Sequence, residues 1–156
     1  MTRTYGEYEV TLDSKGRIAL PAIYKKQINN EESKTFMLTK GNDNYLILYT
    51  ASQWKKVEET LDTLNDYNEE AMELKIIMMS GASPIEADAA GRIVIPKRMI
   101  QYADFKKDLI MLGMSDKMLI WDADEYEKAI DVNKDRQKAL SMKILGSSYS
   151  NPTKQV

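Results

Sequence analysis

Two short segments of the sequence carry an aspartate and an arginine four residues apart. The first segment runs from Asp13 to Arg17 and the second from Asp88 to Arg92, and a glycine precedes each arginine. An aspartate at the start of a glycine turn accepts hydrogen bonds from backbone N–H groups of that turn. Arginine presents a planar fork of donors that matches phosphates and the edges of bases. The chemistry expected of these segments is therefore the binding of an anion or a base edge.

Residue chemistry alone leaves two interpretations of each pair. In the first, the aspartate and arginine only clamp their own turn, as a surface ion pair worth roughly 0–1 kcal/mol. In the second, the rigid turn presents the arginine to phosphates, with Lys15, Lys25 and Lys26 as neighbouring cations of the first segment. The two are compatible, because an aspartate that orients the arginine serves folding and binding together. The second segment has two alanines in place of Ser14 and Lys15, so we rank it below the first.

The residue types argue against catalysis. The sequence has no histidine and no cysteine, so the commonest zinc ligands, the usual imidazole base and the thiol nucleophile are all missing. The remaining carboxylates, lysines, serines and tyrosines form no recognisable catalytic motif. We therefore expect no enzymatic activity, no cofactor and no metal.

Charge is distributed unevenly along the chain. The net charge at pH 7 is only −2, but residues 91–98 hold three cations and no acid, whereas residues 51–73 hold seven acids and two lysines. A local basic face can attract phosphates while the whole molecule stays near neutral.

The elements that position these segments are repeated as well. The block 12–21 returns as 87–96, and each block leads to a second apolar run and then to a helix with an aromatic residue, Trp54 or Tyr126. Such a repeat indicates a fold built twice. Units of roughly 45 residues seldom hold a core alone, so we expect the halves to share one. The predicted organisation is repeat 1 at 7–54, a helical connector at 55–82, repeat 2 at 83–126, and a C-terminal helix with a loose tail at 127–156.

Local patterns predict the elements inside each half. A strand, a turn and a strand surround each aspartate, and Pro21 and Pro96 suit the start of a short helix. Capping-box patterns at Thr50 and Asp122 predict helix starts. A further helix between Asn68 and Gly81 is apolar on more than one side, so we expect it to be buried between partners. The remaining predicted strands are 35–39, 45–49, 108–112 and 117–121.

No apolar run approaches the roughly 18–20 residues needed to cross a bilayer, and the first residues lack the apolar stretch of a signal peptide. We therefore expect a cytoplasmic protein without a membrane partner. The absence of cysteine fits a reducing compartment.

The two Asp-x-x-Gly-Arg-(apolar)-x-(apolar)-Pro blocks, the strand 45–49 before the Trp54 helix, the linker 79–82 and the strand at Trp121 together resemble the MraZ family of bacterial transcription regulators. The resemblance covers residues 4–130. It implies a mainly β fold with added helices (α+β), in which two SpoVT/AbrB-like repeats form a swapped-hairpin β-barrel within one chain. It also implies ring-shaped homo-oligomers that bind short direct repeats upstream of the division and cell-wall gene cluster, including the family's own promoter.

Carried over by position, the family's Asp-x-x-x-Arg motif falls on the two segments described above. The connector departs from the family pattern, because residues 73–79 hold one lysine, Lys75, where relatives often carry arginines. The predicted double-stranded DNA-binding residues are Arg17, Lys15, Asp13, Arg92, Asp88, Arg3, Lys25 and Lys26.

The resulting hypothesis is a sequence-specific, nucleoid-associated transcriptional repressor. An oligomeric protein-interaction module and an antitoxin-like regulator are the alternatives, since related barrels serve both roles. The salt dependence of binding separates the DNA-binding hypothesis from these alternatives, because binding to DNA weakens steeply as the salt concentration rises.

Overall fold

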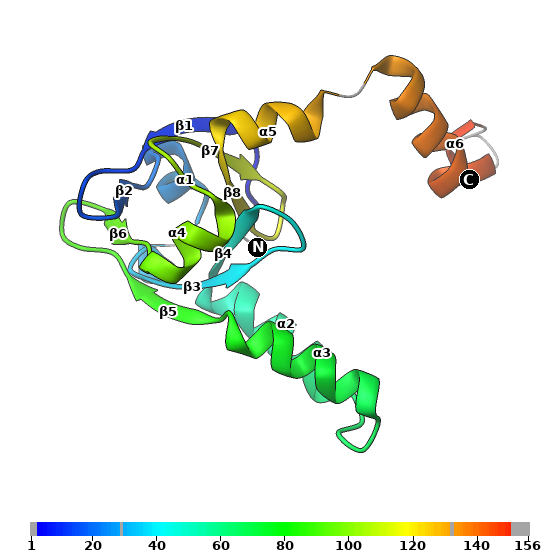
Figure 1. Cartoon of the computed structure of the whole chain (residues 1–156), viewed down its shortest axis with the longest axis horizontal. Helices are drawn as coiled ribbons and strands as arrows, with labels where there is room; N and C mark the ends of the chain where they lie inside the picture. Colours follow the sequence, from blue (N-terminus) through cyan, green and yellow to red (C-terminus); the bar gives the residue numbers. More distant parts are fainter. Residues whose placement is uncertain (1–2, 29, 132, 151–156) are drawn as a thin grey trace. The chain divides into compact units, whose positions relative to one another are not determined.

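The computed structural model describes residues 3–28, 30–131 and 133–150 (Figure 1). These residues form a mixed α+β fold with two compact units, one ending at Ala123 and one beginning at Asp124. The order strand, strand, helix, strand, strand, helix occurs twice along the chain. The strands are β1 (Glu7–Thr11), β2 (Arg17–Ala19), β3 (Thr35–Lys40), β4 (Tyr45–Thr50), β5 (Ser83–Glu86), β6 (Arg92–Val94), β7 (Asp108–Gly113) and β8 (Met118–Asp122).

The helices lie close to the predicted positions. The first unit contains α1 (Ala22–Gln27), a short 3-10 turn η1 (Asn30–Glu32), α2 (Ala51–Asp62), α3 (Glu69–Ser80) and α4 (Lys97–Ala103). The second unit contains α6 (Lys134–Ser150) and, except for its first residue, α5 (Ala123–Ile130). Each short helix α1 and α4 follows a proline, as the sequence predicted.

The strands form two sheets, and the pairing crosses between the halves of the chain. A six-stranded antiparallel sheet has the order β1-β7-β8-β4-β3-β5, and β2 pairs only with β6 in a separate two-stranded ribbon. The first strand of each half therefore pairs with the other half: β1 with β7, and β5 with β3.

The six-stranded sheet is not closed into the barrel that the resemblance implies. Among the described residues, β1 and β5 are its two edges. The ribbon strands are only three residues long. Pro21 and Pro96 soon follow them and lack the N–H group that would continue a ladder.

One hydrophobic core draws on both halves, as predicted. Ile18 and Ile93, from the two ribbon strands, are buried together with Leu38, Leu48 and Met111 from the larger sheet. Burial of a large aliphatic side chain contributes roughly 1.5–3 kcal/mol. The ribbon is therefore held in place by the same core that stabilises the sheet.

The first capping box is confirmed. The Thr50 side chain accepts a hydrogen bond from the Gln53 backbone at 3.3 Å, and the Gln53 side chain accepts one from the Thr50 backbone at 3.0 Å. Trp54 and Leu61 on the same helix are buried. The predicted ends of α3 are also confirmed, with Asn68 as its N-cap and Gly81 as its C-cap.

The expectation that α3 is buried is wrong for the single chain. None of its residues is buried, and Ile76 and Ile77 are 58% and 59% exposed. The helix is apolar on more than one side, but the described residues of one chain leave its large side chains exposed, and the α2–α3 hairpin extends away from the sheet (Figure 1).

The C-terminal region is more helical than expected. The composition from Gly146 onward predicted a loose tail, but α6 continues to Ser150 with a kink at Gly146. The remaining predicted tail, 151–156, lies outside the described residues. Within the part of the chain that the structure describes, no helix combines the length and apolar character needed to span a membrane.

Candidate nucleic-acid interface

The first Asp-Arg segment is a tight turn organised by one carboxylate. Asp13 Oδ1 accepts hydrogen bonds from the backbone N–H groups of Lys15 and Arg17, both at 2.9 Å. Asp13 Oδ2 accepts a third from Arg17 Nε at 2.8 Å. Gly16 has a φ of +76°, a conformation that suits glycine. The aspartate thus fixes the turn and one edge of the guanidinium together.

The second segment repeats this geometry. Asp88 accepts hydrogen bonds from the backbone of Ala90 and Arg92 and from Arg92 Nε, all at 2.9 Å. Gly91 has a φ of +78°. The sequence repeat is therefore a repeat of atomic geometry.

Both arginines keep part of their donor set available. Each uses Nε for its aspartate, and the Nη groups donate no hydrogen bond to any residue in the described ranges. The Arg17 and Arg92 side chains are 27% and 40% exposed. The clamp of the first interpretation is therefore present, and it leaves the outer edge of each fork accessible, as the second interpretation requires.

The same hydrogen bonds change the acidity of the aspartates. The backbone N–H of Arg17 is the largest cause that lowers the pKa of Asp13 below its usual 3.8, and the Arg17 side chain and the Lys15 N–H add to it. The pKa of Asp88 is lowered in the same way by Arg92 and Ala90. In both cases partial desolvation opposes the shift without reversing it. Because the pKa of each carboxyl is lowered, both aspartates are ionised partners of their arginines at neutral pH.

The two-stranded ribbon brings the two arginines together. Arg17 pairs with Val94, and Arg92 pairs with Ala19, on either side of the Ile18–Ile93 pair. The isoleucines face the core, so the alternation of strands places Arg17 and Arg92 on the opposite, outer face. They occupy diagonal positions, about 7–8 Å apart at Cα.

Backbone hydrogen bonds also tie each turn to the other half. Leu20 N donates to Gly91 O at 3.0 Å, and Ile95 N donates to Gly16 O at 2.7 Å. The two arginine turns are therefore fixed relative to each other.

The structure changes the expected place of Lys25. Its Nζ lies against Gly91 so closely that a Cβ at that position would clash with it. The equivalent residue of the second half is Ile100, whose Cδ1 would lie 3.5 Å from a Cβ at Gly16. Lys25 therefore lies beside the second turn. It supplies a cation to that turn, which has two alanines where the first turn has Ser14 and Lys15. Our ranking of the second turn below the first overlooked this contribution.

Comparisons with known proteins identify the family of the chain. A family model described as "MraZ protein, putative antitoxin-like" matches residues 4–75 and 78–142. The chain belongs to the MraZ family.

Relatives across this family share most of their length with the chain. A protein of Caldanaerobacter subterraneus subsp. tengcongensis is 38% identical over 82% of this chain and 89% of its own length. Proteins of Cytophaga hutchinsonii and Clostridium tetani are 31% and 35% identical, over 96% and 90% of this chain and 96% and 97% of their own lengths. All three are named "Transcriptional regulator MraZ", which describes a regulatory role and not a catalytic one.

The other predicted binding residues of this MraZ-family chain fall in different places. Lys15 and Lys26 are exposed beside the first turn and on α1. Arg3 lies apart, because its Nη1 donates to Ser115 Oγ at 3.0 Å, near the Thr4–Ser115 bridge at the opposite end of β1 from the turn. The structure therefore does not bring Arg3 together with the ribbon.

Two cations were left out of the predicted site. Lys97 and Arg98 are exposed at the start of α4, immediately after the second ribbon strand and Pro96. The acid-free basic run at 91–98 was the signal that could have added them.

Proposed function

We propose that this MraZ-family chain is a sequence-specific DNA-binding transcriptional regulator. It represses the division and cell-wall gene cluster, including its own promoter, by binding short direct repeats as a ring-shaped homo-oligomer. It acts in the cytoplasm, in association with the nucleoid. The names of the relatives support a regulatory role, and the ribbon geometry supports DNA as the ligand.

One observation carries the proposal: two arginine forks with free Nη groups project from the outer face of a single rigid ribbon. The major groove of DNA admits a two-stranded β-ribbon, and arginine is the usual bidentate partner of guanine. Asp13 and Asp88 act as positioning residues. The proposed contacts to phosphates or bases come from Arg17, Arg92, Lys15, Lys25 and Lys26.

The proposal also extends to the fold. The crossed pairings β1–β7, β5–β3 and β2–β6 support a swapped-hairpin arrangement of two AbrB-like repeats, with boundaries near 7–54 and 83–126. In this arrangement a single chain supplies both arginine turns of one DNA-contacting surface.

The assembly supplies affinity that one chain lacks. A ribbon with a few phosphate contacts binds weakly at physiological salt, because each contact is weakened by counterions. Several ribbons on one ring engage spaced sites at a high effective concentration. The short direct repeats would then match the number and spacing of subunits.

The central test replaces the arginines one at a time. Arg17→Ala and Arg92→Ala should each lower operator affinity tenfold or more in a gel shift at about 150 mM salt, since each removes a fork and a charge. The melting temperature should change little, because an exposed ion pair contributes only about 0–1 kcal/mol. Arg3→Ala is the matched control, with the same loss of charge at the far end of β1.

If Arg17→Ala binds as well as the parent, Arg17 is only a turn clamp. An equal loss for Arg3→Ala would place DNA on a different surface. The operator itself can be found by selecting bound fragments with the purified protein, and enrichment of short, evenly spaced repeats is the expected result.

The antitoxin-like alternative is favoured by the wording of the family description. It predicts a complex with a toxin protein that survives high salt. DNA binding instead predicts that the logarithm of the binding constant falls with the logarithm of salt, with a slope of about −0.9 per phosphate contacted.

A further inference from the structure

The α2–α3 hairpin exposes an apolar surface that one chain leaves uncovered. Large apolar side chains of α3 are exposed even though the helix is well capped at both ends. Exposed apolar patches on a folded domain commonly mark an interaction site. The exposed residues are Met72, Leu74, Ile76, Ile77 and Met79.

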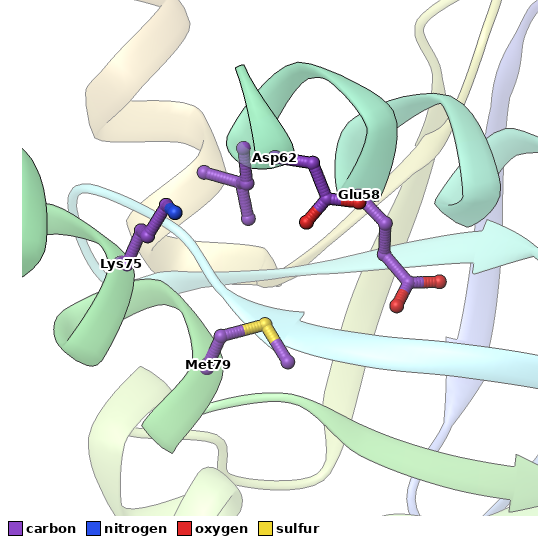
Figure 2. A pocket seen from close by; sticks show the side chains of 5 residues that line it. Glu58, Asp62, Lys75 and Met79 are labelled. Atoms are coloured by element: carbon purple, nitrogen blue, oxygen red, sulfur yellow. The ribbon is translucent and has the colours of Figure 1, made fainter. Parts of the chain in front are cut away.

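A pocket opens between the two helices of the hairpin (Figure 2). Glu58, Leu61 and Asp62 line it from α2, and Lys75 and Met79 line it from α3. Its volume is about 160 Å³. A space of this volume can take one side chain, and Leu61 and Met79 supply its apolar lining.

The pocket has an acidic rim. Residues 55–75 contain seven acids and three lysines. Lys75 is already engaged, because its Nζ donates to the Asp66 carboxylate and to Leu64 O. Glu58 and Asp62 form no ion pair with any of the residues described in the structure. The rim therefore suits a partner that is both apolar and cationic.

Helix α6 has these properties. Its residues 134–145 include four cations and one acid, and none of these cations forms an ion pair within the described parts of the chain. Ile144 is 73% exposed, and Met142 and Leu145 are also exposed. The four cations are Lys134, Arg136, Lys138 and Lys143.

We propose that α6 of one copy docks on the α2–α3 hairpin of a second copy. An apolar side chain of α6 enters the pocket, and its lysines face Glu58 and Asp62. This inference rests on the self-association in the proposed function and specifies the surfaces that carry it.

Charge determines which surfaces can meet. Two acidic hairpins repel each other, so a symmetric hairpin-to-hairpin contact is disfavoured. A contact between two different surfaces is heterologous, and heterologous contacts close into rings when the rotation between copies allows it. The acidic hairpin and the basic helix form such a pair.

Two charge-reversed forms of the full chain test the contact. The hairpin variant carries Glu58→Lys and Asp62→Lys, and the helix variant carries Lys138→Glu and Lys143→Glu. Each should raise the dissociation constant of self-association about tenfold or more, because like charges then face each other across the contact. Sedimentation over a concentration series measures this.

Mixing the two variants separates contact between copies from contact within a chain. The unaltered helix of the hairpin variant can still meet the unaltered hairpin of the helix variant, and the two altered surfaces also carry opposite charges, so the mixture should assemble with equal numbers of the two variants. Each variant alone has one damaged surface at every contact, so it should assemble less than the parent at the same concentration. Lys107→Glu and Glu127→Lys, at exposed positions elsewhere, are matched controls that should assemble normally.

The proposal is overturned if either variant assembles like the parent. It is also overturned if both variants are monomeric and their mixture forms no complex, since the helix would then meet its own hairpin. If the parent chain is monomeric at every concentration, it forms no ring and the proposed contact does not exist. DNA binding through Arg17, measured separately by gel shift, distinguishes failure of this contact from failure of the proposed function.

Discussion

Each aspartate of the repeated segments orders its turn and its arginine through a single carboxylate. Asp13 accepts two backbone N–H donors on one carboxylate oxygen and Arg17 Nε on the other. The hydrogen bond at Nε restricts the orientation of the guanidinium. A pre-ordered fork loses less side-chain entropy when it binds than a mobile one. In the proposed function, the aspartate therefore acts by ordering the arginine and not by contact with DNA.

This arrangement predicts an acid-sensitive turn. Because the pKa of Asp13 and of Asp88 is lowered in the folded chain, the ionised carboxylate contributes stability above the usual pKa of 3.8. That contribution is lost as the pH falls through the lower, folded-state pKa. Carboxyl NMR titration should place both midpoints below 3.8, whereas a midpoint at or above 3.8 would contradict the observed hydrogen bonds.

Lys25 carries a second prediction at this scale. Its Nζ lies against Gly91 in the second turn, so Lys25→Ala removes a cation from that turn and not from the first. DNA affinity should fall severalfold. The slope of the logarithm of the binding constant against the logarithm of salt should become less steep, by the amount that corresponds to about one phosphate contact. Combining it with Arg92→Ala should be less than additive, because both act on one turn.

Lys26→Ala provides the control for Lys25. It removes the same charge from the next residue of α1, which is more exposed and is itself a proposed DNA contact. Its loss of affinity should therefore add to that of Arg92→Ala, whereas the loss from Lys25→Ala should not add fully. If both alanine variants have the same effect in every background, the position of Lys25 over the second turn contributes nothing specific.

At the scale of elements, the β2–β6 ribbon links the core to the candidate site. Ile18 and Ile93 pair across its inner face and are both fully buried, while Arg17 and Arg92 lie on the other face. Since neighbouring residues of a strand face opposite sides, the burial of the isoleucines determines where the arginines point.

Ile93→Ala should therefore damage stability and binding together. The truncation leaves a cavity in the core, with an expected loss of about 2–5 kcal/mol in the free energy of unfolding, measured by urea denaturation. DNA affinity should also fall, because the ribbon that holds both arginines loosens. Val94→Ala is the control: Val94 is exposed, so stability should change by less than about 0.5 kcal/mol.

Local signals predicted most of these elements, because their causes are local. Glycines in the two turns, prolines before the short helices and the capping box at Thr50 each act within a few residues of the chain. The pairing of β1 with β7 and of β5 with β3 could not be predicted from spacing or periodicity, because it joins residues far apart in the sequence. The family resemblance implied a swapped-hairpin barrel, which the open six-stranded sheet does not confirm.

The same reasoning explains two differences between the expected and the observed positions of residues. Lys25 is close in sequence to the first turn but packs against the second, because the halves interlock. The apolar faces of α3 predicted burial, yet a single chain provides too little surface to cover them. Both differences come from contacts that neither composition nor periodicity records.

For the whole molecule, the strand order has an internal symmetry. Exchanging the equivalent strands of the two halves converts the order β1-β7-β8-β4-β3-β5 into the same order reversed. The same exchange swaps β2 and β6, so the two-stranded ribbon is unchanged. One chain is thus arranged like a dimer, with two equivalent arginine turns on one surface. A larger assembly would multiply that surface at fixed spacing.

This symmetry leads to a prediction about the operator. A ring that places several ribbons on one DNA should bind a fragment with two correctly spaced repeats roughly 10²–10⁴ times more tightly than a fragment with one. The salt slope should steepen in proportion to the number of phosphates contacted. Gel shifts over a series of salt concentrations measure both.

Moving the repeats apart by about 5 bp, half a helical turn, should abolish the gain because the second site then faces away. Equal affinity for one repeat and for two would show that single chains bind DNA independently.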